Sequence, residues 1–390
     1  MKVLSKISFL FVTIFAFEAS AQVQVYPVSD SVYSEEPYVD EQTGEMRAPR
    51  EFQYVGNAFR APTYDPNVRL PNRPDHITSE VEKVRARGKI RCGSHMQVKS
   101  FAYQDDNIWH GIDADFCRIF ALALLGDSEK IEMVDVAPNR VAEALNTNKI
   151  DVMLSGAGYV AAMETSGQAT SAGVLYYDHQ MVMSKNAEVK TLEQMKHKKI
   201  CLSTDTDYYQ NFDNYNVGRG LNISYLSFPN LAKAKEAFLL NRCDMMTASG
   251  LMLNGILKDL PNSKAVILSD YVALKPVYAF VRRDNNELRL AVKWILNALL
   301  LAEQHGINVR NLEFFASNDN PEIRNLLGDD ETLWKNMNMD PQWVRKAVAL
   351  LGNYADIYDR NLGEASDYHL QRREGRLVKD GGTMYPIPFL

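Results

Sequence analysis

The sequence predicts an α/β protein built as two lobes that two extended crossings join. Strands and helices alternate at short spacing between residues 89 and 247, which is typical of largely parallel sheets covered by helices. Extended sequence near Tyr177–Met183 leaves the first lobe, and extended sequence near Lys275–Arg283 returns to it. From Asn286 onward the chain is mostly helical. Two lobes with two crossings form a clamshell that closes about a hinge.

Local patterns place the elements of the first lobe. Thr78 or Ser79 is a favoured cap for a short helix that ends at Arg87. After this helix we expect strands at 89–92, 131–136 and 150–154, an aromatic-bearing hairpin before Gly111, and helices at 116–125 and 139–146.

The second lobe repeats the alternation, and a helical region follows it. Trp334, Trp343 and Tyr354 are expected to anchor that helical region on the first lobe, with a surface for a partner as the alternative. We expect strands at 199–203, 223–228, 243–247, 266–268 and 277–282, and helices at 208–215, 231–240, 287–304, 322–327, 332–336 and 341–358.

The N-terminal region predicts export. Two lysines precede a short apolar run, Ile7–Phe17, and Ala19–Ala21 fits the small-residue rule for cleavage, so residues 1–21 are expected to be a signal peptide. Residues 22–78 form a Pro/Tyr-rich acidic extension in which the density of proline excludes long helices. This extension is either a loose leader or an arm that docks a partner through its tyrosines.

The composition narrows the class of partner. The 390 residues carry a net charge of −6, which argues against a nucleic-acid partner. After the leader, no apolar run approaches the ~20 residues of a membrane-spanning helix, so we expect a soluble exported protein. No histidine lies at ligand spacing from a cysteine, and we expect neither a metal nor another cofactor.

Four cysteines in an exported chain suggest two disulfides, for which three pairings exist. Cys92 and Cys117 belong to one strand–helix unit, whereas Cys201 and Cys243 flank another alternating segment. We therefore expect the local pairing, Cys92–Cys117 and Cys201–Cys243. Buried free thiols are the alternative, which an oxidising compartment disfavours.

Short motifs between residues 80 and 390 occur in the same order as in a known protein family, although no single motif is specific by itself. They are Arg91-Cys92-Gly93, the run from Trp109 to Arg118, Leu125-Gly126-Asp127, Lys149-Ile150-Asp151-Val152, Tyr176-Tyr177-Asp178, Asn241-Arg242-Cys243-Asp244, the run from Ser317 to Arg324, Gly352-Asn353-Tyr354 and the run from Gly381 to Tyr385.

In this order the motifs resemble the general L-amino-acid-binding proteins of polar amino-acid ABC transporters, in solute-binding protein family 3. The resemblance implies a type II periplasmic-binding-protein fold with two α/β lobes, a two-strand hinge and a helical C-terminal region. We place the first part of lobe 1 at 79–180, lobe 2 at 181–278, and the return to lobe 1 with the helical region at 279–390. The resemblance also implies a periplasmic protein that presents a small-molecule ligand to an inner-membrane ABC permease.

The charged groups that would grip an amino acid are missing. In the family that the chain resembles, an arginine of the first lobe binds the ligand's carboxylate, and an acid of the second lobe binds its ammonium group. These two positions fall on Met163 and Ser249. A charge-assisted hydrogen bond contributes on the order of 1.5–3 kcal/mol, so a free α-amino acid is a poor ligand. We expect an amino-acid derivative or a cationic solute instead.

Other first-lobe side chains are candidates for the ligand contacts. Phe101, Tyr103 and Tyr159 are candidate stacking walls, with packing in the core as the alternative. The run Gly156-Ala157-Gly158 allows close approach of a ligand and offers backbone donors, or it is a tight turn at a strand end.

The loop Thr204-Asp205-Thr206 lies where the family has its second-lobe anion loop. Thr206 remains a donor, but the acids make the loop suited to a cation if they face the cleft. The alternative for Asp207 is that it caps the helix that follows.

Enzymatic interpretations find little support. Asp113 and Asp115 form a carboxylate pair, but their place at a helix start explains them as helix-capping acids. The histidines are scattered, and none lies at a recognisable spacing from a nucleophile. The remaining alternative to a transport receptor is a clamshell with a weak or empty cleft, acting as a structural or sensory subunit of an envelope protein assembly.

Overall fold

The structure is a computed structural model, and it describes residues 38–39, 46–47, 79–96, 100–155, 161–165, 167–204, 206–258, 260, 264–329 and 331–389. Met1–Arg73 and Pro74–Leu390 are separate units. In the first unit, β1 (Tyr38–Val39) and β2 (Met46–Arg47) pair antiparallel. The expected signal peptide and most of the expected extension lie outside the described residues.

An eight-stranded mixed sheet forms the centre of Pro74–Leu390, in the order β10-β9-β11-β8-β12-β7-β3-β6. Parallel pairs occur at both ends, among β3, β6 and β7 and among β9, β10 and β11. These strands are β3 (Ile90–Ser94), β6 (Ile131–Asp135), β7 (Val152–Met153), β9 (Lys199–Ser203), β10 (Ser224–Phe228) and β11 (Met245–Ser249).

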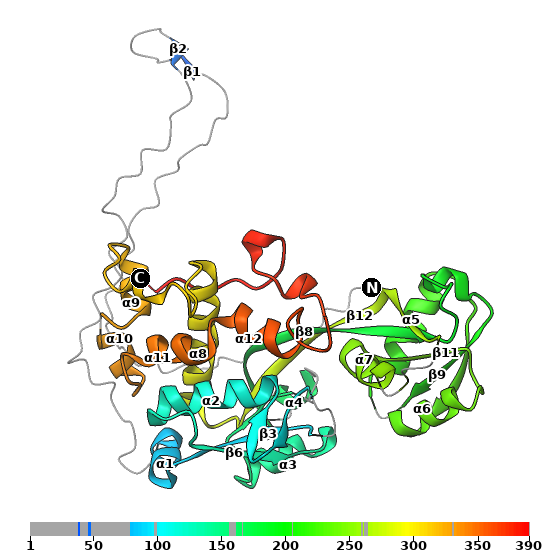
Figure 1. The fold of residues 1–390 in the computed structure, drawn as a ribbon, viewed down its shortest axis with the longest axis horizontal. Helices are drawn as coiled ribbons and strands as arrows, with labels where there is room; N and C mark the ends of the chain where they lie inside the picture. The colour runs from blue at the N-terminus through cyan, green and yellow to red at the C-terminus, as the bar shows by residue number, and fades with distance from the viewer. Residues whose placement is uncertain are drawn as a thin grey trace, which may run out of the picture. The chain divides into compact units, whose positions relative to one another are not determined.

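Two long antiparallel strands, β8 (Thr170–Ser184) and β12 (Val266–Val281), join these two groups. Figure 1 shows both strands running from the elements around β3 to the elements around β9. The predicted α/β fold with a two-strand hinge is therefore confirmed. The lobe boundaries placed at residues 180 and 278 fall inside these strands, and they stay predictions.

Helices cover the sheet. Ser79 caps α1, because its hydroxyl accepts a hydrogen bond from Glu82 N at 3.2 Å. The helices are α1 (Glu80–Arg87), α2 (Ile112–Leu125), α3 (Val141–Asn146), α4 (Ala161–Thr165), α5 (Tyr208–Gly218), α6 (Leu231–Leu239), α7 (Gly250–Lys258), α8 (Asn286–Gln304), α9 (Pro321–Leu326), α10 (Glu331–Asn336), α11 (Trp343–Leu351) and α12 (Tyr354–Asn361). A hairpin of two antiparallel strands, β4 (Tyr103–Asp105) and β5 (Ile108–His110), precedes α2.

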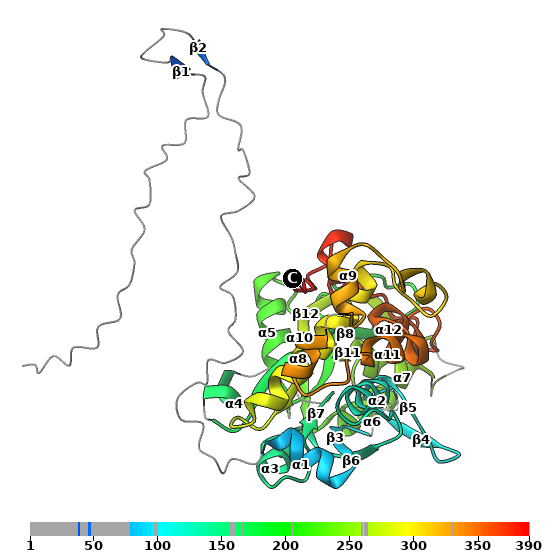
Figure 2. The same ribbon diagram turned by 90° about the vertical axis from the view of Figure 1, so that its left-hand side faces the viewer.

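One apolar core joins the first-lobe strands to the C-terminal helices. Trp334, Trp343 and Tyr354 are buried in the same cluster as Ile90 of β3, so the predicted anchoring of the helical region is confirmed. Figure 2 shows α8, α11 and α12 beside α2, and their residues contact those of α2 or of one another. None of the described helices combines the length and the apolar character that a bilayer crossing requires.

The structure joins two of the expected strands and breaks one of the expected helices. The separate strands expected at 266–268 and 277–282 are one strand, β12. The single helix expected at 341–358 is broken at Gly352, where a φ of +81° ends α11 and Asn353 caps α12 in a capping box with Asp356. A Cβ at position 352 would lie 2.4 Å from the Asp356 Cβ, so the break requires glycine.

The cysteines form two disulfides with the expected local pairing. Cys92 of β3 is bonded to Cys117 of α2, with 6.1 Å between the Cα atoms. Cys201 of β9 is bonded to Cys243, just before β11, with 5.7 Å between the Cα atoms. One bridge thus fastens a helix to its strand in the first lobe, and the other fastens two neighbouring strand segments in the second.

We expect the Cys92→Ala/Cys117→Ala variant to lose about 3–4 kcal/mol of unfolding free energy, because the bridge closes a loop between residues 25 apart. Urea denaturation of the purified protein measures the change. The single variant Cys92→Ala breaks the same bridge and should lose a similar amount. A loss below about 1 kcal/mol in both variants would contradict a stabilising bridge at this site.

Candidate ligand-binding cleft

A cavity of about 1300 Å³ lies between the first-lobe and second-lobe elements. It exceeds the roughly 300–1,000 Å³ that is usual for small-molecule sites. Residues between 95 and 139 line one wall, residues between 206 and 258 line another, and residues 360–368 form a third side. The first two walls include the loops that follow β3, β6 and β9, where parallel sheets place their ligand sites.

The first wall is organised by the start of α2. The backbone carbonyls of Ser100 and Phe101 accept hydrogen bonds from the N–H groups of Ile112 and Asp113, at 3.1 and 2.9 Å. Gly111 makes this approach possible, because its φ is +108° and a Cβ there would lie 2.4 Å from the Phe101 carbonyl oxygen. Backbone carbonyls, rather than acidic side chains, are therefore bonded to the first N–H groups of α2.

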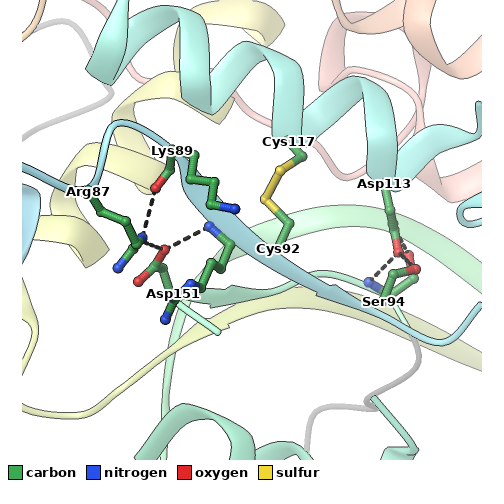
Figure 3. Close-up of a disulfide and its surroundings, with 9 residues drawn as sticks. Arg87, Lys89, Cys92, Ser94, Asp113, Cys117 and Asp151 are labelled. Atoms are coloured by element: carbon green, nitrogen blue, oxygen red, sulfur yellow. Dashed lines mark hydrogen bonds and ion pairs between the residues drawn. A yellow bond between two sulfur atoms is a disulfide. The ribbon is translucent and has the colours of Figure 1, made fainter. Parts of the chain in front are cut away.

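Asp113 has a different role from the helix cap that the sequence suggested. Its buried carboxylate accepts hydrogen bonds from the Ser94 hydroxyl at 2.6 Å, the Ser155 hydroxyl at 2.6 Å and the Ser155 N–H at 3.0 Å. Figure 3 shows the Asp113 carboxylate beside Ser94, on the helix whose Cys117 is bonded to Cys92. Asp113 thus ties α2 to the ends of β3 and β7, and burial raises its pKa to about 7.

Asp115, two residues further along α2, joins this helix to the C-terminal region. One of its carboxylate oxygens accepts hydrogen bonds from Arg360 at 2.7 Å and from the Asn361 side-chain amide at 2.6 Å. The other oxygen lies 3.4 Å from an Arg118 nitrogen. These bonds hold the end of α12 at the cleft, which explains why residues 360–368 line it.

Two buried polar atoms of the first wall have no hydrogen-bond partner in the described structure. They are Ser100 Oγ, in a residue that is 3 % exposed, and His95 Nδ1. Both residues line the cavity. Burial also lowers the pKa of His95, which favours its neutral form. Unpaired buried polar atoms are costly, and a bound solute would satisfy them.

Tyr208, the first residue of α5, organises the second wall. Its hydroxyl accepts a hydrogen bond from Ser249 N at 3.1 Å, and its backbone carbonyl accepts one from the Gln180 side chain at 2.9 Å. Asp207 does not cap α5 through its side chain, because its carboxylate pairs with Lys275 of β12. Thr206 Oγ1 accepts the Tyr208 N–H at 3.3 Å instead.

The structure places only some of the predicted ligand residues on the cavity. Tyr103 lines it, is 40 % exposed and stacks on His110 with 5.2 Å between ring centroids, and Thr206 also lines it. Phe101 is not a cleft wall, because it is 4 % exposed and packs in the first-lobe core. Thr204 lies away from the cavity lining, with its hydroxyl 3.2 Å from the Phe228 carbonyl.

Met163 and Ser249, which stand where the family has its charged ligand-binding residues, do not line the cavity. Met163 lies in α4 against an apolar cluster that contains Phe280, and Ser249 is 4 % exposed at the end of β11. Gly156, Ala157, Gly158, Tyr159 and Asp205 lie outside the described residues.

Sequence reasoning missed several lining residues. Ser100 and His95 follow a predicted parallel strand, and that position was the signal that could have found them. Arg360 and Asp367 had no such signal, because only the packing of α12 against α2 brings them to the cleft. Within the described ranges, no cluster of three or more His, Cys, Asp or Glu side chains suits a metal ion.

The model of the bacterial extracellular solute-binding proteins, family 3, matches residues 90–305. The chain belongs to this family. A solved structure from Brucella ovis, an ABC transporter periplasmic binding protein with glutathione bound, is 30 % identical with a TM-score of 0.72, covering 80 % of this chain and 99 % of that one. Its similarity supports the type II two-lobed fold.

Curated relatives agree with the family assignment. The glutamate/glutamine/aspartate/asparagine-binding protein BztA of Rhodobacter capsulatus is 29 % identical over 80 % of this chain and 93 % of its own. The general L-amino acid-binding periplasmic protein AapJ of Rhizobium johnstonii is 27 % identical over 78 % and 91 %. Members of this family bind solutes, so the prediction of a non-enzymatic protein is confirmed.

We expect Asp113→Asn to flatten the pH dependence of this family 3 protein's stability. The folded pKa of about 7 lies above the usual value of 3.8, so the contribution of Asp113 is full below about pH 4 and is lost as the pH rises to about 7. The difference in unfolding free energy between wild type and variant should therefore fall across this range, by up to about 1.4 kcal/mol per pH unit. Urea midpoints at successive pH values measure it, and parallel profiles would contradict the raised pKa.

Proposed function

We propose that the protein is the periplasmic receptor of an ABC importer, and that its solute is an amino-acid derivative of about the size of glutathione rather than a free α-amino acid. One observation carries the proposal. In the part of the chain that the structure describes, the cavity of about 1300 Å³ has Ser100 and His95 atoms without partners on one wall. Met163 and Ser249 stand at the two positions where the family has its charged ligand-binding residues. A larger solute can use other groups of this cleft.

The charge of the lining supports an anionic solute. Four basic side chains line the cavity with two acidic ones: Arg118, Lys235, Lys258 and Arg360 with Asp115 and Asp367. Arg118 and Arg360 share Asp115, and Lys258 pairs with Asp367, so the lining holds more positive than negative charge even with these pairs formed. The excess is local, because the whole chain carries a net charge of −6. Basic side chains in a cleft attract and orient carboxylates. This lining disfavours the cationic solute that the acids at 205 and 207 suggested, and Asp207 is occupied by Lys275.

Glutathione fits this description as a class of solute. It has two carboxylates and one ammonium group, and its length exceeds that of a free amino acid. The similar Brucella ovis protein has glutathione bound. BztA and AapJ are named for amino acids, which keeps the solute within amino-acid chemistry. A solute that touches both walls favours the closed state, and the closed receptor would then be recognised by its permease.

The first test is a binding screen of the purified protein with glutathione, L-glutamate, L-arginine and a diamine. We expect glutathione to raise the melting temperature, because a ligand at a hundredfold its Kd adds about 2.7 kcal/mol to the stability of the folded state. Isothermal titration calorimetry should give tighter binding of glutathione than of either amino acid. Tight binding of glutamate or arginine without glutathione binding would contradict the proposal, and tight diamine binding would restore the cationic alternative.

We expect Ser100→Ala to lower glutathione affinity about threefold to tenfold, because a neutral hydrogen bond to the solute is lost. The same change should leave the unfolding free energy unchanged or raise it, since the buried Ser100 hydroxyl has no partner among the described residues. Calorimetry and urea denaturation measure the two effects.

Ser155→Ala is the matched control for stability, because the Ser155 hydroxyl is bonded to Asp113 and accepts a bond from Tyr176. It should lower the unfolding free energy by about 1–3 kcal/mol. A Ser100→Ala variant that is destabilised to the same degree, or that binds glutathione as well as wild type, would contradict the assignment of Ser100.

A further inference from the structure

Residues 361–374 follow α12, and this segment, the strap, is attached to the first lobe near both of its ends. At its start, the Asn361 side-chain amide donates to the Asp115 carboxylate of α2 at 2.6 Å. Near its other end, Arg372 donates to both carboxylate oxygens of Glu303 in α8, at 2.7 and 3.2 Å. This second ion pair is mostly buried, since its side chains are 14 % and 11 % exposed. Two parallel bonds of this kind fix the geometry of a pair, so both ends of the strap move with the first lobe.

The middle of the strap contacts the second lobe at the cleft. The Lys258 ammonium group lies 2.9 Å from the Asp367 carboxylate and 4.4 Å from the centre of the Tyr368 ring. Lys258 is the last residue of α7, and α7 follows β11 directly in the chain. All three side chains line the cavity. The contact therefore joins the second-lobe wall of the cleft to a segment that is attached to the first lobe.

The last residue of the strap contacts both crossing strands. The Glu374 carboxylate lies 2.6 Å from His179 Nε2 of β8 and accepts a hydrogen bond from the Tyr271 hydroxyl of β12 at 3.1 Å. Gln180, which follows His179, is the residue of β8 that lies opposite Ser249 of β11. Glu374 thus meets the crossing strands where they begin to pair with the second group of strands.

Opening of the cleft would separate these contacts. A hinge motion turns the second lobe away from the first, whereas the strap stays with the first lobe. Lys258 would then leave Asp367 and Tyr368, so these contacts stabilise the arrangement in which the two walls are close. The Asp367 side chain is 88 % exposed, and an exposed ion pair contributes little to the stability of a fold. The same small contribution is enough to change the populations of two closely balanced states.

We propose that residues 361–374 hold the two walls of the cleft together in the solute-free protein. This inference goes beyond the proposed function, because it concerns the balance between open and closed protein rather than the solute. The strap lies outside residues 90–305, which match the family model, so the closing device belongs to the C-terminal region. A receptor that is already closed for part of the time binds its solute more tightly, because less free energy is used in closing.

The test measures the distance between the lobes without any solute. Nitroxide labels on Glu143→Cys of α3 and Lys233→Cys of α6 report this distance by double electron–electron resonance, and both side chains are more than half exposed. Lys258→Met removes the charge that binds Asp367 and Tyr368. It should raise the ratio of open to closed molecules about twofold to fivefold, which is the range for an exposed ion pair.

Three further variants separate the strap from a general effect of charge. Asp367→Asn should open the cleft less than Lys258→Met does, because the contact with the aromatic ring remains. Glu374→Gln keeps the shape of the side chain, weakens its bonds to the crossing strands, and should also raise the open fraction. Glu364→Gln removes an equal charge from the strap, but its carboxylate faces His369 of the same segment at 3.8 Å, so it should keep the wild-type distance.

Wild-type distances in Lys258→Met, Asp367→Asn and Glu374→Gln would overturn the inference, as would equal opening in Glu364→Gln. Salt gives a second measurement on the chain without strap substitutions, because it screens exposed charges. The labelled protein should open as the salt concentration rises, while labelled Lys258→Met should change less, and equal changes would overturn the inference. Since no solute is present, a failure of the proposed function leaves these measurements valid.

Discussion

The carboxylate of Asp113 accepts three hydrogen bonds from Ser94 and Ser155, and these bonds set the position of α2 relative to the ends of β3 and β7. The same helix is fastened to β3 by the Cys92–Cys117 bridge. With one end of α2 held in this way, Asp115 bonds to Arg360 of the C-terminal region. The backbone carbonyls of Ser100 and Phe101 accept hydrogen bonds from the first N–H groups of α2. The first wall of the cleft therefore depends on a buried acid that is fully satisfied by neutral donors.

The two long strands give the second constraint, because β8 and β12 are the connection between the two groups of parallel strands. The C-terminal region is bonded to both: the Glu374 carboxylate is 2.6 Å from His179 Nε2 of β8 and accepts the Tyr271 hydroxyl of β12 at 3.1 Å. Lys258 of α7 also pairs with Asp367 at 2.9 Å. The segment after α12 thus contacts both crossing strands and the cleft, while the C-terminal helices cover the first-lobe core.

Different residues of this protein maintain the fold and line the cavity, so the solute can change while the fold stays the same. The core of apolar strands and helices, the bridges and the Asp113 bonds maintain the two lobes. The cavity is lined by loops at the strand ends and by the segment 360–368. A neutral Met163 and Ser249 are compatible with the same architecture, because Met163 packs on an apolar cluster and Ser249 is satisfied by Tyr208 and Asp178. Fold and solute chemistry are therefore separable.

The alternating elements, the anchoring tryptophans and the local disulfides were predictable, because periodicity and short spacing encode them in neighbouring residues. The roles of Asp113 and Asp207 were not: each looked like a local helix cap, and each is decided by a distant partner. Asp178 and Ser249 likewise meet only because β8 and β11 pair in the sheet. The sequence by itself determined the lobes and the family; the tertiary structure decided which side chains face the cleft, since hydrogen bonds and burial there join residues far apart in the chain.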